Sequence, residues 1–165
     1  MLWKITRNPN KMFFEQIEIS DFLLLVTQYV IWCNKNNQKI TVNNYKLDDI
    51  KTIGHHDLNS KTKYNISESL KILRTRTNIV DIGSITRASM CVGTGDFTFA
   101  VFTGTEHKNC DIAAVKVIVE EAGGKVTDFF GNEQRYDKSI NGAVISNGKV
   151  HNEVLGVIKK YIIEE

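Results

Sequence analysis

Residues 109–131, NCDIAAVKVIVEEAGGKVTDFFG, decide the fold of this chain, because they read as an apolar helix, a glycine stop and a strand. The apolar residues that recur at helical spacing are Ile112, Val115, Val119 and Ala122. Most of the remaining helix surface is also apolar, and it is formed by Ala113, Ala114, Val117 and Ile118. We therefore expect a helix that is buried on both sides. Gly123 and Gly124 can adopt the positive φ that ends a helix. The alternation from Val126 to Asp128 then predicts a strand.

One polar residue, Asp111, stands at the entrance of this apolar helix. Asp is a common N-cap, because its side-chain oxygen accepts a hydrogen bond from a free backbone N–H of the first turn. A carboxylate held at the mouth of a rigid helix can equally serve as a ligand in a metal or phosphate site. The pattern around Asp111 leaves both interpretations open.

The composition is that of an ordinary soluble domain with a sizeable core: 165 residues, 42% hydrophobic and 24% charged. The net charge of +2 is small and the lysines are scattered, which argues against nucleic acid or an anionic membrane as a partner. The three cysteines lack the paired spacing of a structural zinc site. We expect no signal peptide and a cytoplasmic location. The apolar run 22–32 is too short to span a bilayer.

The first third of the chain carries weak signals for strands at residues 2–5, 12–14, 22–32 and 39–42. Residues 22–32 could equally form a short helix. No internal repeat is visible.

The middle of the chain is more polar. Residues 47–53 precede Gly54-His55-His56-Asp57, which we interpret as a solvated loop, since no further metal ligand follows at useful spacing. Residues 67–73 have helical character, with Ser67 as a candidate cap. Arg74 and Arg76 follow; they either form a solvated helix end or support an anion.

From residue 79 onward the pattern alternates strands and helices. We expect strands at residues 79–82, 97–102 and 142–146, and helices that begin after Gly83-Ser84 and at residue 151, the last one ending near residue 163. Residues Ile85, Ala88, Cys91 and Val92 should form the inner surface of the first helix, and Phe97, Phe99 and Val101 should share one strand face. This order predicts a layered α/β domain. Gly83-Ser84 and Asp111 both lie at strand-to-helix entrances, so they could share one crevice.

Residues 110–114, CDIAA, and 120–128, EEAGGKVTD, resemble the C-terminal signature of the inositol monophosphatase family, in which W-D-x-A-A/G leads to E-A-G-G-x-v-x-D. Gly83-Ser84, Gly131 and the closing Ile145-Ser146-Asn147 add to the resemblance. It is strong over residues 79–146 and patchy before them.

The resemblance implies a magnesium-dependent phosphomonoesterase of the lithium-sensitive type, with a layered α/β/α/β/α fold. Residues 78–165 would be its C-terminal α/β domain, and residues 1–77 a remnant of the N-terminal sheet domain with a connecting segment. In the family the carboxylate at the Asp111 position is a metal ligand, and the turn at Gly83, Ser84 and Ile85 lines the substrate pocket. Glu106 is a candidate for the glutamate that binds inositol. The resemblance assigns no catalytic residue to this chain.

The sequence departs from the family in its metal motifs, at Cys110 and in the loop before Asp111, which is longer than in the inositol enzymes. We find no counterpart of the E-E and D-P-I/L-D-G-T segments that supply the other metal ligands, and Cys110 stands where Trp is usual. One carboxylate cannot build a two-metal site.

Three hypotheses follow for the function. The chain is the truncated C-terminal part of a phosphatase acting on an inositol phosphate or sugar phosphate, and is inactive alone. Alternatively it is a non-catalytic domain that binds a sugar phosphate or regulates another protein. In the third hypothesis it is a structural subunit that completes its sheet by pairing with another chain. The partners expected besides a small phosphorylated substrate are a second copy of the chain or the missing N-terminal half.

Overall fold

A computed structural model describes residues 39–57, 62–104 and 109–164. The predicted strands at residues 2–5, 12–14 and 22–32 lie outside the described residues.

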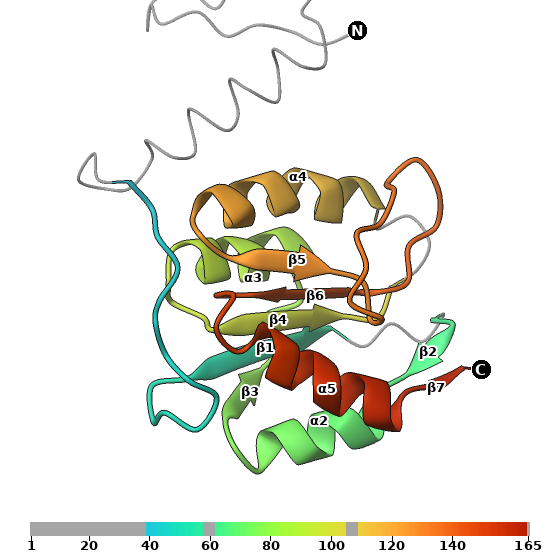
Figure 1. Ribbon diagram of the computed structural model, residues 1–165, viewed down its shortest axis with the longest axis horizontal. Helices are drawn as coiled ribbons and strands as arrows, with labels where there is room; N and C mark the ends of the chain where they lie inside the picture. Colours follow the sequence, from blue (N-terminus) through green and yellow to red (C-terminus); the bar gives the residue numbers. More distant parts are fainter. Residues whose placement is uncertain (1–38, 58–61, 105–108, 165) are drawn as a thin grey trace, which may run out of the picture. The chain divides into compact units, whose positions relative to one another are not determined.

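The described chain is built around a five-stranded mixed sheet with the order β3-β1-β4-β6-β5 (Figure 1). Its strands are β1 (Ile53–Asp57), β3 (Asn78–Val80), β4 (Phe99–Phe102), β5 (Lys125–Thr127) and β6 (Ala143–Ser146). Strands β3, β1 and β4 are parallel, whereas β6 runs antiparallel to both of its neighbours. A separate two-stranded ribbon pairs β2 (Tyr64–Asn65) with β7 (Ile163–Glu164). The predicted α/β fold is confirmed.

Two pairs of helices cover the two faces of the sheet (Figure 1). They are α2 (Ser67–Arg74) with α5 (His151–Tyr161), and α3 (Ile85–Gly93) with α4 (Asn109–Glu121). The two-residue period of β4 divides the core between the faces: Phe99 and Val101 pack with residues of α2 and α5, whereas Ala100 and Phe102 pack with residues of α3 and α4. In the described residues the layers are therefore helices, sheet and helices. Strand β1 and helix α2 belong to this same body, and the predicted domain boundary at residues 77 and 78 stays a prediction.

The interpretation of residues 54–57 as a solvated loop is wrong, because these residues form most of β1, between β3 and β4. His55 is fully buried on the α3 and α4 side, with its ring centroid 5.4 Å from that of Phe102. His56 faces the opposite side, where its Nε2 lies 2.7 Å from Nη2 of Arg74. Pairing with a strand on each side outweighs the polar composition of this segment.

The predicted strand at residues 39–42 is also wrong, because residues 39–46 form no strand. The N–H of Val42 donates to the carbonyl of Ala122 (3.1 Å). The segment is instead held by a side chain: Asn43 Nδ2 donates to the carbonyls of Gly95 (2.9 Å) and Phe97 (3.0 Å), while Asn43 Oδ1 accepts from Asn147 Nδ2 (3.0 Å).

Two helix boundaries, the start of α3 and the end of α4, lie where the sequence predicts them. Ser84 caps α3, because its hydroxyl accepts a hydrogen bond from the N–H of Arg87 (3.3 Å). Gly123, with φ 91°, ends α4, and the N–H of Gly124 donates to the carbonyl of Val119 (2.8 Å).

Four details of the helix and strand predictions are corrected. Ser67 is the first helical residue of α2 rather than its cap. Helix α5 ends at Tyr161, because Ile163 pairs with Asn65 in the ribbon. Phe97 precedes β4 and packs against the cluster that holds Ala100, not the one that holds Phe99. Helix α4 is not buried on both sides by the described residues, since Ala114 is exposed.

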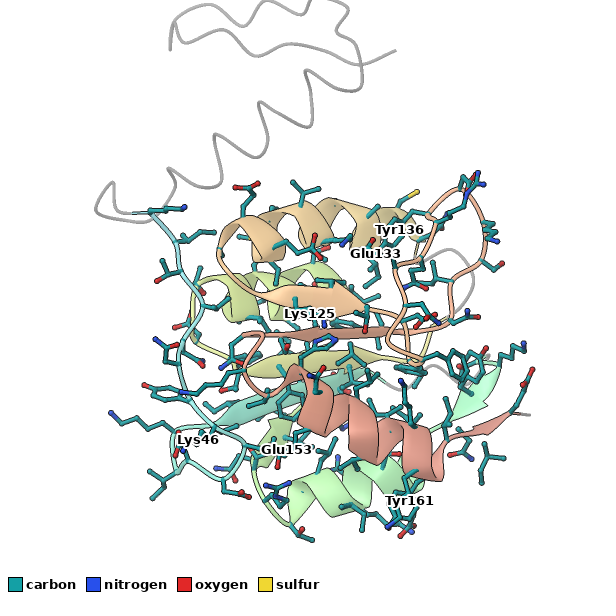
Figure 2. The ribbon with its side chains drawn as sticks, viewed as in Figure 1. Lys46, Lys125, Glu133, Tyr136, Glu153 and Tyr161 are labelled. Atoms are coloured by element: carbon teal, nitrogen blue, oxygen red, sulfur yellow. The ribbon has the colours of Figure 1, made fainter. Side chains whose placement is uncertain are left out.

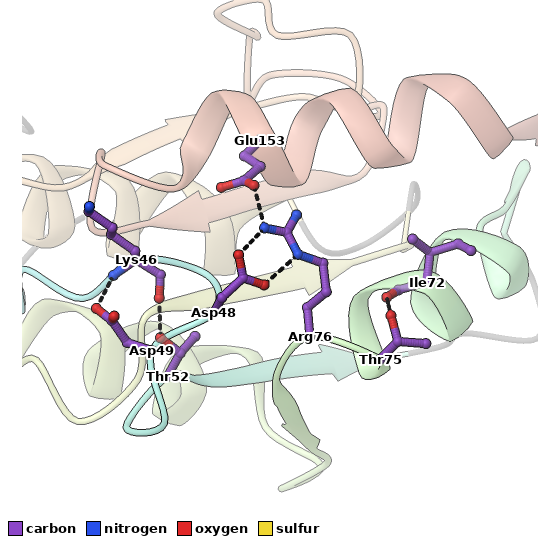
Figure 3. Close-up of polar contacts among 8 residues, drawn as sticks. All are labelled: Lys46, Asp48, Asp49, Thr52, Ile72, Thr75, Arg76 and Glu153. Atoms are coloured by element: carbon purple, nitrogen blue, oxygen red, sulfur yellow. Dashed lines mark hydrogen bonds and ion pairs between the residues drawn. The ribbon is translucent and has the colours of Figure 1, made fainter.

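Arg76 ties the loop before β1 to helix α5 (Figure 3). Its Nε donates to Oδ1 of Asp48 (2.6 Å), and its Nη2 pairs with Oε1 of Glu153 (2.6 Å). These hydrogen bonds, first that of Asp48 and then that of Glu153, raise the pKa of Arg76 above its ordinary value. Arg76 is therefore not simply a solvated helix end: it joins segments far apart in the sequence.

We expect Arg76→Ala to lower the melting temperature by a few degrees, because two carboxylates on different segments lose their shared partner. Arg135→Ala is the matched control. Arg135 pairs with Asp137, two residues away, and both side chains are exposed (76% and 58%), so its loss should leave the melting temperature unchanged. Equal shifts for the two variants in circular dichroism melts would contradict the role of Arg76.

His151, the first residue of α5, is fully buried between two hydroxyl groups. Its Nε2 lies 2.9 Å from Oγ1 of Thr127, and its Nδ1 lies 2.9 Å from Oγ of Ser146. The Thr127 hydroxyl donates to the carbonyl of Asp128 and the Ser146 hydroxyl accepts from the N–H of Gly148. This pattern favours the neutral ring with its proton on Nε2. One uncharged imidazole thus joins β5, β6 and α5.

Burial, and after it the charge of Lys125, lowers the pKa of His151 from 6.5 to about 4. The unfolded chain binds a proton below its own His pKa, whereas the folded chain does so only near the lower value. The stabilisation is therefore complete above the unfolded pKa and is lost as the pH falls toward the folded pKa. We expect a loss of about 2 kcal/mol between about pH 7 and about pH 5, measured by guanidinium unfolding.

His151→Gln should remove this part of the pH dependence, because an amide does not titrate in that range. Identical slopes of stability against pH for the variant and the wild type would show that His151 is not the titrating group.

Candidate functional site

Helices α3 and α4 begin at the same edge of the sheet. Strands β3, β1 and β4 are parallel, so their carboxyl ends share one edge; α3 follows β3 in the chain and α4 follows β4 (Figure 1). Ile85 and Ile112, from the first turns of the two helices, belong to one apolar cluster. The two helix entrances that the sequence singled out are thus brought to one edge of the sheet.

Asp111 is the third residue of α4, because the helix begins at Asn109. It is therefore not the N-cap, and this interpretation is wrong. Its side chain is exposed, and among the described residues it makes no hydrogen bond or ion pair. A carboxylate in the first turn is favoured by the positive end of the helix dipole. The oxygens of Asp111 remain available to a ligand.

The turn into α3 combines an open backbone with a buried side chain. Gly83 has φ 64°, and a Cβ at this position would meet no atom within 4 Å. The Ser84 hydroxyl is engaged as the helix cap. The side chain of Ile85 is buried in the core between α3 and the sheet. The N–H of Gly83 already donates to Oδ1 of Asp81 (2.8 Å). A ligand at this turn would therefore approach over Gly83 toward the helix N-terminus and would not meet the side chain of Ile85. Glu106 lies outside the described residues.

The described residues offer Mg²⁺ one ligand rather than a complete site. No group of three or more His, Cys, Asp or Glu side chains that could hold a metal occurs in residues 39–57, 62–104 and 109–164. Mg²⁺ prefers oxygen ligands and is often held by one or two carboxylates together with waters and a substrate phosphate. The exposed carboxylate of Asp111 fits the role of one such ligand. A second ion would need carboxylates from elsewhere.

The loop between β5 and β6 lies against α4, a contact that the sequence does not predict. Asn109 Nδ2 donates to the main-chain carbonyl of Tyr136 (2.6 Å), and Lys116 Nζ pairs with Oε1 of Glu133 (3.0 Å). Figure 2 labels Glu133 and Tyr136 beside α4. The half-buried Tyr136 packs against the α3 and α4 core, and burial raises the pKa of its hydroxyl. The apolar Tyr136 and Ile140 within a polar stretch were the available signal.

None of the helices in the described part of the chain is long and apolar enough to cross a membrane.

Comparison with known proteins finds relatives that are named as phosphatases. A 93-residue segment is 40% identical to a fructose-1,6-bisphosphatase/inositol-1-monophosphatase of Thermotoga maritima, covering 56% of this chain and 34% of the relative. A 95-residue segment is 34% identical to a bifunctional NADP phosphatase/NAD kinase of Methanococcus maripaludis, covering 54% of this chain and 17% of the relative.

Solved structures show the same fold. The structure of an IMPase from Thermotoga maritima matches with a TM-score of 0.62 and 29% identity, over 76% of this chain and 47% of that protein. An IMPase/NADP phosphatase complexed with Mg²⁺ and phosphate matches with a TM-score of 0.61 and 25% identity, over 74% of this chain and 44% of that protein.

The chain spans about a third or less of these two curated relatives and less than half of these two solved structures. The sequence profile of the inositol monophosphatase family matches residues 31–162. The chain therefore belongs to the inositol monophosphatase family.

Proposed function

We propose that this chain takes part in the Mg²⁺-dependent hydrolysis of a small phosphate monoester, either an inositol phosphate or a sugar phosphate. The observation that carries the proposal is the exposed carboxylate of Asp111, which has no partner among the described residues and lies in the first turn of α4. The names of the relatives, which include an inositol-1-monophosphatase and an NADP phosphatase, support phosphate monoesters as the substrate class.

The residues of the chain would act mainly by binding and orienting. Asp111 supplies oxygen ligands at a fixed place on α4. The backbone of Gly83 leaves room for a close approach, and the N-terminus of α3 presents N–H groups that favour an anion. Bound Mg²⁺ supplies positive charge that offsets the charge developing on the phosphoryl oxygens.

We further propose that these 165 residues are not a competent phosphatase by themselves. The sequence supplies one carboxylate of the metal site and has no counterpart of the E-E and D-P-x-D-G-T segments. The remaining ligands would come from segments outside these 165 residues. The small net charge and the scattered cysteines favour a cytoplasmic reaction without nucleic acid or membrane as a partner.

The test is a phosphate-release assay with Mg²⁺ on inositol 1-phosphate, fructose 1,6-bisphosphate and NADP. We expect no turnover by the chain alone. Turnover should appear when the N-terminal half of the Thermotoga maritima relative is added. Asp111→Asn should then lower the rate at least about 100-fold, since loss of even an outer partner of a metal ligand costs about 10- to 100-fold.

Asp96→Asn is the matched control. Asp96 is an exposed carboxylate just beyond the C-terminal end of α3, at the opposite edge of the sheet. Its loss should leave the rate unchanged. Robust turnover by the chain alone would contradict the incomplete site, and an Asp111→Asn variant as active as wild type would contradict the role of Asp111. Binding of a phosphate monoester without turnover, both by the chain alone and with the N-terminal half added, would favour the hypothesis of a non-catalytic binding domain.

A further inference from the structure

The position of the Asp111 carboxylate is set by the first turn of α4, since Asp111 makes no polar contact with the other described residues. The first turn of a helix is the part most prone to opening, because its N–H groups lack partners within the helix. Ligand atoms of a working site need to be held within about half an ångström of their productive place. Something outside Asp111 must therefore hold this turn.

Asn109, the first residue of α4, provides such a tie. Its amide Nδ2 donates to the main-chain carbonyl of Tyr136 at 2.6 Å, across 27 residues of sequence. Lys116, seven residues further along the helix, contacts the same loop through Glu133 at 3.0 Å. Residues seven apart lie on one helix face, so the loop follows this face from the entrance of α4 into its middle.

The acceptor at Tyr136 is itself well fixed. The tyrosine ring packs against the apolar cluster that contains Ile112 and Ile140. Within the loop, Gln134 Nε2 donates to the carbonyl of Gly142 (2.9 Å), and Gln134 Oε1 accepts from the N–H of Asn141 (3.0 Å). The ion pair between Lys116 and Glu133 adds little to this support, because the Lys116 side chain is 14% exposed but that of Glu133 is 77% exposed and solvent screens the pair. Asn109 is thus bonded to a rigid support.

We propose that Asn109 is a positioning residue, which holds the first turn of α4 against the carbonyl of Tyr136 and so keeps the Asp111 carboxylate in place for a divalent cation. This inference rests on the proposed function, because it takes Asp111 as the ligand. Outer partners that orient a metal ligand contribute about 10- to 100-fold to metal affinity.

The test uses the full ¹⁵N-labelled chain and Mn²⁺, a paramagnetic ion that accepts the same oxygen ligands as Mg²⁺. In the wild type we expect broadening of the amide signals around Asp111, and Asp111→Asn should abolish it. In Asn109→Ala the order parameter of the Asp111 amide should fall from the rigid value of about 0.85. The apparent Kd for Mn²⁺ should rise about 10-fold, with the chain still folded.

Tyr136→Phe is the matched control, because the hydrogen bond ends on the main-chain carbonyl and the ring is retained. This variant should keep the wild-type order parameter and Kd. An Asn109→Ala variant with unchanged order parameter and unchanged Kd would overturn the inference and leave the proposed function standing. Absence of any Asp111-dependent broadening in the wild type would overturn the inference, whereas the proposed function is judged by the phosphate-release assay with the N-terminal half of the relative present.

Discussion

The parallel pairing of β3, β1 and β4 is the constraint on which the rest of the described structure depends. It places three carboxyl ends at one edge of the sheet, and the helices that follow β3 and β4 both begin there. Because β1 is the middle strand of this trio and helices cover both faces of the sheet, the histidines at positions 55 and 56 become core residues. Without this parallel pairing, the N-termini of α3 and α4 would not lie at the same edge of the sheet.

Different interactions attach the helices to the two faces of the sheet. On the α2 and α5 face, the neutral ring of His151 joins β5, β6 and α5, and Arg76 fastens the loop before β1 to α5. On the α3 and α4 face, apolar packing dominates and the β5–β6 loop adds polar ties to α4. The polar links of the first face support the fold, whereas those of the second lie beside the candidate site.

Sequence patterns predicted the elements whose boundaries depend on local chemistry. The hydroxyl of Ser84 caps α3, and Gly123 ends α4, because caps and glycine stops are decided by a few neighbouring residues. The strand at residues 53–57 was missed, since its stability comes from two neighbours distant in sequence rather than from alternation.

The candidate site was likewise predictable only where a local sequence motif marks it. Asp111 was identifiable from its motif, but its place inside the first turn required the observed helix start at Asn109. The tie from Asn109 to Tyr136 joins a side chain to a backbone carbonyl, and a main-chain acceptor leaves no signature in residue types. The exposed Ala114 on a helix predicted to be buried all round also depends on which segments cover α4, which residue types do not specify.

The central claim is that Asp111 is a ligand of a divalent cation in a phosphate-ester site. Crystals of the chain in complex with the N-terminal half of the Thermotoga maritima relative, grown with Mn²⁺ and inorganic phosphate, with diffraction data collected at the manganese edge, test it most directly. The account predicts an anomalous peak about 2.0 to 2.2 Å from a carboxylate oxygen of Asp111, at the edge where α3 and α4 begin. Well-ordered density for Asp111 with no anomalous peak beside it, or a peak only at other carboxylates, would contradict the account.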